Sequence, residues 1–271
     1  MGEKIAIVTN KPQTTRNRIC AVVNREGCQF ASWTPPACTR PAPAWGTTMV
    51  KVVKESVADV DAVLLLVEPI PHIGGPEAEL IRRIKELNVP AVLVINKIDT
   101  VEKEELLSVM QVYGAAHDFA AIVPISAKRN EGVDELLGLL AQFLPEGPQL
   151  FPEDMVTDQP ERQVCAEIIR EKLLLCLDKE IPHGTAVEIT TFSERDDGII
   201  DLDATIYCEK ASHKGIIIGK GGAMLKKIST LARTDIEAFM GTKVFLQTWV
   251  KVKENWRDNM NLIKNFGYRD E

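Results

Sequence analysis

The chain has 271 residues, 45% of them hydrophobic, and its 32 basic against 39 acidic side chains leave a formal net charge of −7. At roughly 100 to 200 residues per domain, this length predicts two domains with enough apolar side chains for real cores. The longest apolar run, residues 62–67, is far shorter than the roughly 20 residues that cross a bilayer, so we expect neither a membrane span nor a signal peptide. The six cysteines have no C-x-x-C spacing, which favours reduced thiols over a disulfide or zinc framework.

The first half of the chain alternates between two kinds of pattern. Short apolar runs rich in β-branched residues, each followed by polar residues, are typical of buried parallel strands. They occur at residues 62–67, 91–95 and 121–125. Apolar residues at helical spacing predict helices at 76–88, 101–110 and 133–143. The alternation predicts an α/β fold with a mostly parallel sheet, whose ligands bind at the carboxyl ends of the strands.

The second half has a different organisation. Prolines and scattered acids interrupt the pattern and predict an interdomain linker at 148–160, between a first domain at 1–147 and a second at 161–271. An amphipathic helix at 162–177 follows, then alternating strands at 185–192, 199–208 and 243–252. A glycine-rich segment at 215–222 opens a lysine-rich helix that runs to about residue 238. The second domain is therefore predicted to be α+β.

Charge is distributed unevenly between the two halves. Residues 211–271 hold 11 basic and 6 acidic side chains, a balance of +5, which leaves −12 for residues 1–210. A basic tail on an acidic body indicates a polyanionic partner for the tail. An ordinary solvated surface is an equally open interpretation of the charge alone.

The second apolar run ends directly in Asn96, Lys97, Ile98 and Asp99, an N-K-x-D pattern. A carboxylate at the carboxyl end of a strand can accept hydrogen bonds from both N1–H and the exocyclic amine of guanine, a pair of donors that adenine lacks. We therefore expect Asp99 to select the base, Asn96 to brace the loop and the Lys97 stem to lie against the base. The alternative is a polar turn after a strand.

The next apolar run ends in Ser126, Ala127 and Lys128, where a backbone N–H could meet O6 of guanine. Two such loops on successive strands resemble the guanine-specificity motifs of the translation-factor class of GTPases. The segment 11–16 resembles their switch I, in which a threonine helps to hold Mg²⁺ and the terminal phosphate. The resemblance implies GTP or GDP as ligand, Thr14 and Thr15 near the phosphates, and Thr15 as an Mg²⁺ ligand.

The basic tail contains a G-x-x-G loop, preceded by apolar residues and followed by the lysine-rich helix. Glycines allow the backbone to approach phosphates, and a helix N-terminus with nearby lysines supplies N–H groups and positive charge. The order strand, G-x-x-G, helix, strand resembles a KH domain and predicts RNA binding. A glycine-rich helix start without a ligand is the alternative. The candidate RNA-binding residues are Ile218, Gly219, Lys220, Gly221, Gly222, Lys226 and Lys227.

A guanine-reading α/β domain, a proline-rich linker and a type II KH domain together resemble the Era family of GTPases, over almost the whole chain. The resemblance implies cycling between GTP- and GDP-bound states and binding of the 3′ end of small-subunit ribosomal RNA during assembly of the small ribosomal subunit. It also implies a monomer in the cytoplasm, with peripheral association with the inner membrane. It supplies no side-chain general base, because the chemistry consists mainly of phosphate positioning and charge stabilisation.

The chain departs from this family in its first motif. No G-x-x-x-x-G-K-[ST] sequence, the P-loop that cradles the phosphates, is present. We therefore expect a truncated G domain that lacks its first strand, P-loop and first helix, with apolar surface exposed on the remaining sheet. We also expect weak guanine-nucleotide binding without meaningful hydrolysis. The alternative function is a non-enzymatic KH protein that carries an inactive G-domain remnant.

A second departure concerns the family's D-T-P-G loop, which residues 31–48 do not contain. Ser32 to Thr39 can be encoded so that the frame starting at the third base of the Ser32 codon reads Leu-Asp-Thr-Pro-Gly-Leu-His. We hypothesise that a pair of compensating frameshifts replaced this motif. Resequencing the gene tests the idea, and an unshifted read that confirms Trp33 and Trp45, with no nearby insertion or deletion in the genes of related strains, would end it.

Overall fold

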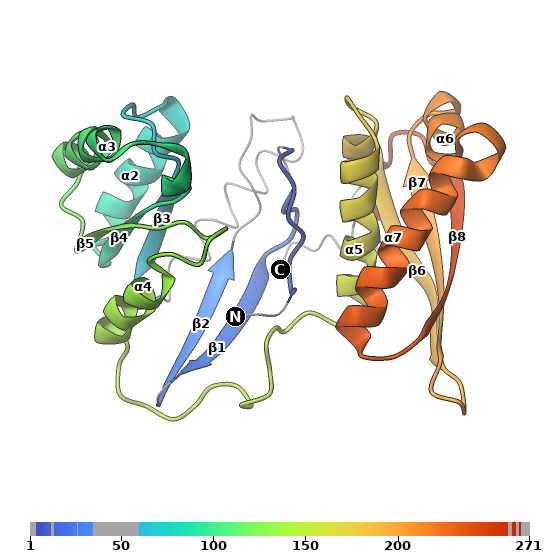
Figure 1. Ribbon diagram of the computed structural model, residues 1–271, viewed down its shortest axis with the longest axis horizontal. Helices are drawn as coiled ribbons and strands as arrows, with labels where there is room; N and C mark the ends of the chain where they lie inside the picture. The colour runs from blue at the N-terminus through green and yellow to red at the C-terminus, as the bar shows by residue number, and fades with distance from the viewer. Residues whose placement is uncertain are drawn as a thin grey trace. The chain divides into compact units, whose positions relative to one another are not determined.

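The computed structural model describes residues 4–11, 14–25, 27–34, 60–259, 262, 263 and 266 (Figure 1). Residues 60–150 form one compact unit, and the described residues up to Arg25, those at 29–34 and those from Phe151 onward form the other. The domain boundaries at 147 and 160 stay predictions. The structure groups residues 4–25 with the second half of the chain. In the part of the chain that the structure describes, no helix is long and apolar enough to span a membrane.

The unit formed by residues 60–150 is built on a parallel sheet in the order β3 (Val63–Val67), β4 (Ala91–Ile95) and β5 (Ala121–Pro124). Its helices are α2 (Gly75–Leu87), α3 (Lys103–Ala116) and α4 (Val133–Leu140). All five residues of β4 are buried, as the predicted central apolar run requires. The predicted strands and helices are present. The helix predicted at 101–110 is longer than expected, and the one predicted at 133–143 ends in a 3₁₀ turn at Ala141–Phe143.

Alternate residues of β4 face two separate cores. Leu93 and Ile95 pack with residues of α2 and α3, whereas Val92 and Val94 pack with Leu136 of α4. Both faces of β4 are therefore covered, which explains why its sequence is apolar without alternation. Apolar exposure on the sheet appears at β3, where Leu66 is 58% exposed.

The second unit contains a sheet in the order β6 (Thr185–Glu194), β7 (Ile200–Cys208) and β8 (Val244–Val252). β6 and β7 are antiparallel, and β7 and β8 are parallel. The helices α5 (Glu161–Cys176) and α7 (Ala223–Met240) pack against one face, and the core between them contains Ile169, Leu202 and Ile228. This is the α+β arrangement that the sequence predicts.

One α-helix of this unit was not predicted. A helix, α6 (Ala211–Ile218), stands between β7 and the G-x-x-G loop, so the expected direct order of strand, loop and helix is wrong. Gly215 and the three isoleucines at 216–218 are poor helix formers, which hid the helix in the sequence. Burial of Ile217 in the core outweighs that weak propensity.

The remaining strands, β1 (Ile19–Arg25) and β2 (Cys28–Thr34), form a two-stranded sheet. The predicted linker packs beside it: the Val22 N–H donates to the carbonyl of Val156 at 3.0 Å, and Gln29 exchanges two hydrogen bonds with the backbone of Phe151. This part of the linker is therefore ordered against β1 and β2. All five described cysteines are free thiols, as their spacing predicts.

Candidate functional site

The loop after β4 carries the N-K-x-D residues at the carboxyl end of the sheet. The side-chain oxygen of Asn96 accepts hydrogen bonds from the N–H of Lys97 at 2.8 Å and from the N–H of Ala127 at 3.1 Å. Lys97 has a φ of 67°, which turns the chain sharply after the strand. Asn96 thus ties its own loop to the loop after β5, which is the bracing role expected for it.

Asp99 and Ser126 meet in the same place. The Ser126 hydroxyl, which is fully buried, donates to Oδ1 of Asp99 at 2.7 Å, and Nε of Arg129 lies 3.9 Å from Oδ2. The hydrogen bond from Ser126 is the main reason that the pKa of Asp99 lies below its ordinary value. Asp99 is therefore a fixed, ionised acceptor at neutral pH, as the recognition of two guanine donors requires.

The two loops meet because β4 and β5 are parallel neighbours, which places their carboxyl ends at one edge of the sheet. A backbone hydrogen bond from Ile98 to Ile125 at 3.2 Å joins them further. Lys97 forms an ion pair with Glu68, just beyond β3, and Lys128 lies exposed beside Ala127. The structure thus brings the six predicted residues of these motifs together, while their contact with a base stays a prediction.

Replacing Ser126 by alanine is expected to lower guanine-nucleotide affinity roughly tenfold, because Asp99 loses the hydrogen bond that orients it. The pKa of Asp99 will rise toward the ordinary value of about 3.9, so affinity will be lost at a higher pH than in the parent chain as the pH falls. Titration with a fluorescent GDP analogue at several pH values measures both effects. Ser108→Ala, which removes a hydroxyl bonded within α3, is the control. Equal affinity in the two variants would contradict the role assigned to Ser126.

The predicted phosphate-side residues, Thr14 and Thr15, lie in the other compact unit. The Thr14 hydroxyl is hydrogen-bonded to the Thr9 hydroxyl at 2.6 Å and donates to the Lys11 carbonyl at 2.7 Å. Among the described residues, no cluster of three His, Cys, Asp or Glu side chains could hold a metal. These observations do not concern the Thr15 hydroxyl, so its role as an Mg²⁺ ligand stays a prediction, and we derive no step through the ion. Most of the segment predicted to replace D-T-P-G, residues 35–48, lies outside the described residues.

The G-x-x-G loop joins α6 to α7. Gly219 has φ 73° and ψ 175°, and Gly221 and Gly222 also have positive φ, so three glycines adopt conformations that other residues avoid. A Cβ at Gly219 would lie 2.7 Å from Cβ of Met224. The loop therefore needs glycine at 219 for close approach to α7.

The electrostatics around this loop favour an anion. The first turn of α7 has no acidic residue, and its N-terminal N–H groups carry partial positive charge. Lys220, Lys226 and Lys227 are exposed there, and Ile218 packs against the core beneath them. The structure places all seven predicted RNA-binding residues in one region, and their contact with RNA stays a prediction.

Sequence reasoning missed two features of these sites. It assigned the Ser126 loop a backbone N–H for guanine but not the hydroxyl that holds Asp99. The only signal in the sequence was the order Ser-Ala-Lys after a strand. This order does not predict that the Ser126 hydroxyl is directed toward Asp99. It also missed α6, which ends at Ile218 directly before the G-x-x-G loop.

The fold of the chain corresponds to a known class of protein. The model of the elongation factor Tu GTP binding domain matches residues 48–146, and the KH domain model matches residues 180–257. The chain thus combines a GTPase domain of the P-loop class with a KH domain.

The relatives narrow this class to one family. GTPase Era of Ruminiclostridium cellulolyticum is 49% identical over 268 residues, which are 99% of this chain and 90% of that protein. GTPase Era of Clostridium kluyveri is 48% identical over 269 residues, 99% of this chain and 92% of the relative. The chain belongs to the GTPase Era family.

Two solved structures of Era proteins support this family assignment. An Era variant of Aquifex aeolicus bound to GDP and AlF4⁻ superposes with a TM-score of 0.94 at 34% identity, covering 100% of this chain and 92% of that one. Era in complex with MgGDPNP and nucleotides 1506–1542 of 16S ribosomal RNA gives the same TM-score, identity and coverage.

Proposed function

We propose that this chain is an Era-type protein that binds guanine nucleotides through the loops after β4 and β5 and binds 16S ribosomal RNA near its 3′ end through the KH loop, in assembly of the small ribosomal subunit. The observation that carries the nucleotide half is the pairing of Asp99 with Ser126 and of Asn96 with Ala127. The RNA half is supported by the glycine loop with its exposed lysines and by the relative that was solved with RNA.

The nucleotide half is expected to be weak in this chain. Without a G-x-x-x-x-G-K-[ST] sequence it has no amide cradle or lysine for the phosphates, and without D-T-P-G it has no group that senses the terminal phosphate. We therefore propose that GTP hydrolysis by these 271 residues is far slower than in relatives with a P-loop. We assign no catalytic residue.

A second candidate function follows from the missing G-x-x-x-x-G-K-[ST] sequence. A KH protein with an inactive G-domain remnant would bind RNA and would not respond to nucleotide. The missing phosphate-binding sequence is the observation that favours it.

Two titrations of the full chain distinguish these functions. Binding of an RNA with nucleotides 1506–1542 of 16S ribosomal RNA is measured at several salt concentrations, with and without GDP, and binding of GDP is compared with that of ADP. The first function predicts that GDP binds more tightly than ADP and that RNA affinity falls steeply with salt. Salt-sensitive RNA binding with no guanine preference supports the second. Absence of RNA binding at low salt would overturn both.

A further inference from the structure

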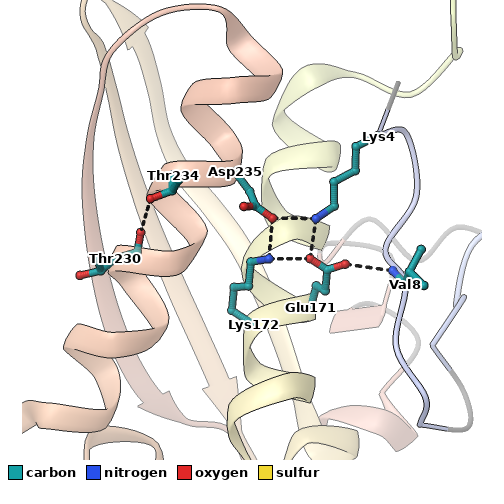
Figure 2. A network of polar contacts seen from close by, with 7 residues as sticks. All are labelled: Lys4, Val8, Glu171, Lys172, Thr230, Thr234 and Asp235. Atoms are coloured by element: carbon teal, nitrogen blue, oxygen red, sulfur yellow. Dashed lines mark hydrogen bonds and ion pairs between the residues drawn. The ribbon is translucent and has the colours of Figure 1, made fainter. Parts of the chain in front are cut away.

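The three-stranded sheet of the KH half has two unlike faces. One face is covered by α5 and α7, with Leu202 in the core between them. A set of four ion pairs ties this layer together (Figure 2). It joins Lys4 and Lys172 to Glu171 and Asp235. This face is therefore closed by the chain itself.

We call the opposite face of the sheet the outer face. In the described part of the chain it is covered at one end, where Trp256 and Phe266 pack with Tyr207. Toward the other end, Phe245 and Trp249 of β8 are 49% and 57% exposed. Large aromatic rings that stay in water on an uncovered face are typical of an interaction surface.

The outer face already holds one arginine of the chain itself. Arg195, directly after β6, donates from Nε to Oδ2 of Asp201 at 2.7 Å and also pairs with the second oxygen of that carboxylate. The guanidinium carbon lies 5.2 Å from the centre of the Phe245 ring. Asp201 and Phe245 are direct neighbours in the register of β7 and β8. A carboxylate and an aromatic ring on adjacent strands thus form a guanidinium site.

A second carboxylate and ring follow along the same strands. Asp203 lies opposite Gln247, so Trp249 is its diagonal neighbour on the outer face, about 8 Å away between Cα atoms. Among the described residues, none donates a hydrogen bond to the Asp203 carboxylate or pairs with it, and no cation lies over Trp249. Asp203 and Trp249 therefore offer the groups that Arg195 uses, without an arginine from the described chain to use them.

The charges of the sheet favour a cation over a polyanion. The three strands hold four acidic side chains and one base, Lys251. On the outer face, Glu188 accepts a hydrogen bond from the Tyr207 hydroxyl at 2.8 Å and has no basic partner among the described residues. Asp203 and Glu188 would repel the phosphates of RNA and attract a basic segment of a protein.

We propose that the outer face binds an arginine-bearing segment of another protein, with one guanidinium over Trp249 and hydrogen-bonded to Asp203. Arginine fits better than lysine, because its planar guanidinium stacks on an indole and donates two hydrogen bonds to a carboxylate. One contact with an exposed ring is weak, so the affinity comes from a segment with several arginines, which Glu188 attracts further. The site uses no residue of the guanine loops or the G-x-x-G loop and is independent of the proposed function.

Binding of a short fluorescein-labelled peptide of alternating arginine and serine to the full chain tests this site. We expect Trp249→Ala and Asp203→Asn each to weaken peptide binding by roughly 3- to 10-fold, measured by anisotropy. Asp196→Asn is the matched control, because Asp196 is an exposed acid in the turn between β6 and β7. Equal weakening by the control would reduce the effect to general charge attraction and overturn the proposal.

Changing the peptide tests the chemistry of the occupant. Citrulline in place of arginine keeps the shape and removes the charge, so binding should be lost. Lysine in place of arginine should bind more weakly, because an ammonium group cannot stack and pair at once. A citrulline peptide that binds as well as the arginine peptide would overturn the proposal.

The fold of the variants is checked by thermal melting and by Trp249→Phe. Phenylalanine retains an aromatic ring on β8, so peptide affinity should stay within about threefold of the parent. Asp203→Asn keeps the size of the side chain and changes only its charge. Unchanged peptide binding by Asp203→Asn or by Trp249→Ala would overturn the proposal.

Two other occupants predict different results. If RNA lies on the outer face, Lys251→Met will weaken and Asp203→Asn will strengthen binding of the 1506–1542 RNA, while peptide binding does not change. If a second copy of the chain lies there, sedimentation of the parent will depend on concentration, and Trp249→Ala will remove that dependence. Either result would overturn the proposal.

Discussion

Replacing Asp99 by alanine is expected to remove the preference for guanine over adenine nucleotides, reducing the ratio of the two affinities by about 100-fold or more. The carboxylate is held at the sheet edge by Ser126 and supplies the acceptor for two donors that guanine has and adenine lacks. Affinity for GDP should fall while affinity for ADP stays nearly constant. Competition of GDP and ADP against one fluorescent nucleotide measures the ratio.

The control for this experiment is Asp118→Ala. Asp118 is an exposed acid after α3 in the same compact unit, so its loss changes the net charge equally without touching the two loops. The ratio should be unchanged in that variant. If Asp99→Ala discriminates between GDP and ADP as well as the parent does, these loops are not a guanine site.

Gly219→Ala is expected to reduce RNA affinity at least tenfold, while the helix content measured by circular dichroism is retained. The backbone conformation at this position is essentially restricted to glycine and costs other residues about 1–3 kcal/mol. The added Cβ would also lie 2.7 Å from Cβ and 3.0 Å from N of Met224, so the loop must move away from the start of α7. Fluorescence anisotropy with the 1506–1542 RNA measures the loss.

Gly241→Ala separates backbone strain from loop geometry. Gly241 follows α7 with φ 68°, and a Cβ there meets no atom within 4 Å. The variant therefore bears the cost of a left-handed residue at the other end of the same helix. Its RNA affinity should match that of the parent chain, and an equal loss in both variants would show that global destabilisation, not the loop, is responsible.

The features that sequence could predict are those set by neighbouring residues. The unbroken apolar run at 91–95 indicated a strand covered on both faces, and β4 packs against two cores. The motif residues 96–99 and 126–128 follow neighbouring strands, so a parallel sheet was enough to predict that they meet. Helix α6 was not predicted, because its stability comes from the burial of Ile217, and local helix propensity does not reveal that burial.

The sequence by itself determined strands β3 to β8, most helices, the two loops after β4 and β5 and the glycine loop, because periodicity and turn chemistry act over a few residues. It did not predict β1 and β2. Only the tertiary structure decided that residues 4–11 and 14–18 pack with the KH half. Lys4 lies 167 positions from Glu171 and 231 from Asp235. Nothing local marks such a pairing, since a lysine near the start of a chain is ordinarily solvated. Lys4 is needed there because folding buries the Glu171 carboxylate on α5, and a buried carboxylate needs a cation beside it.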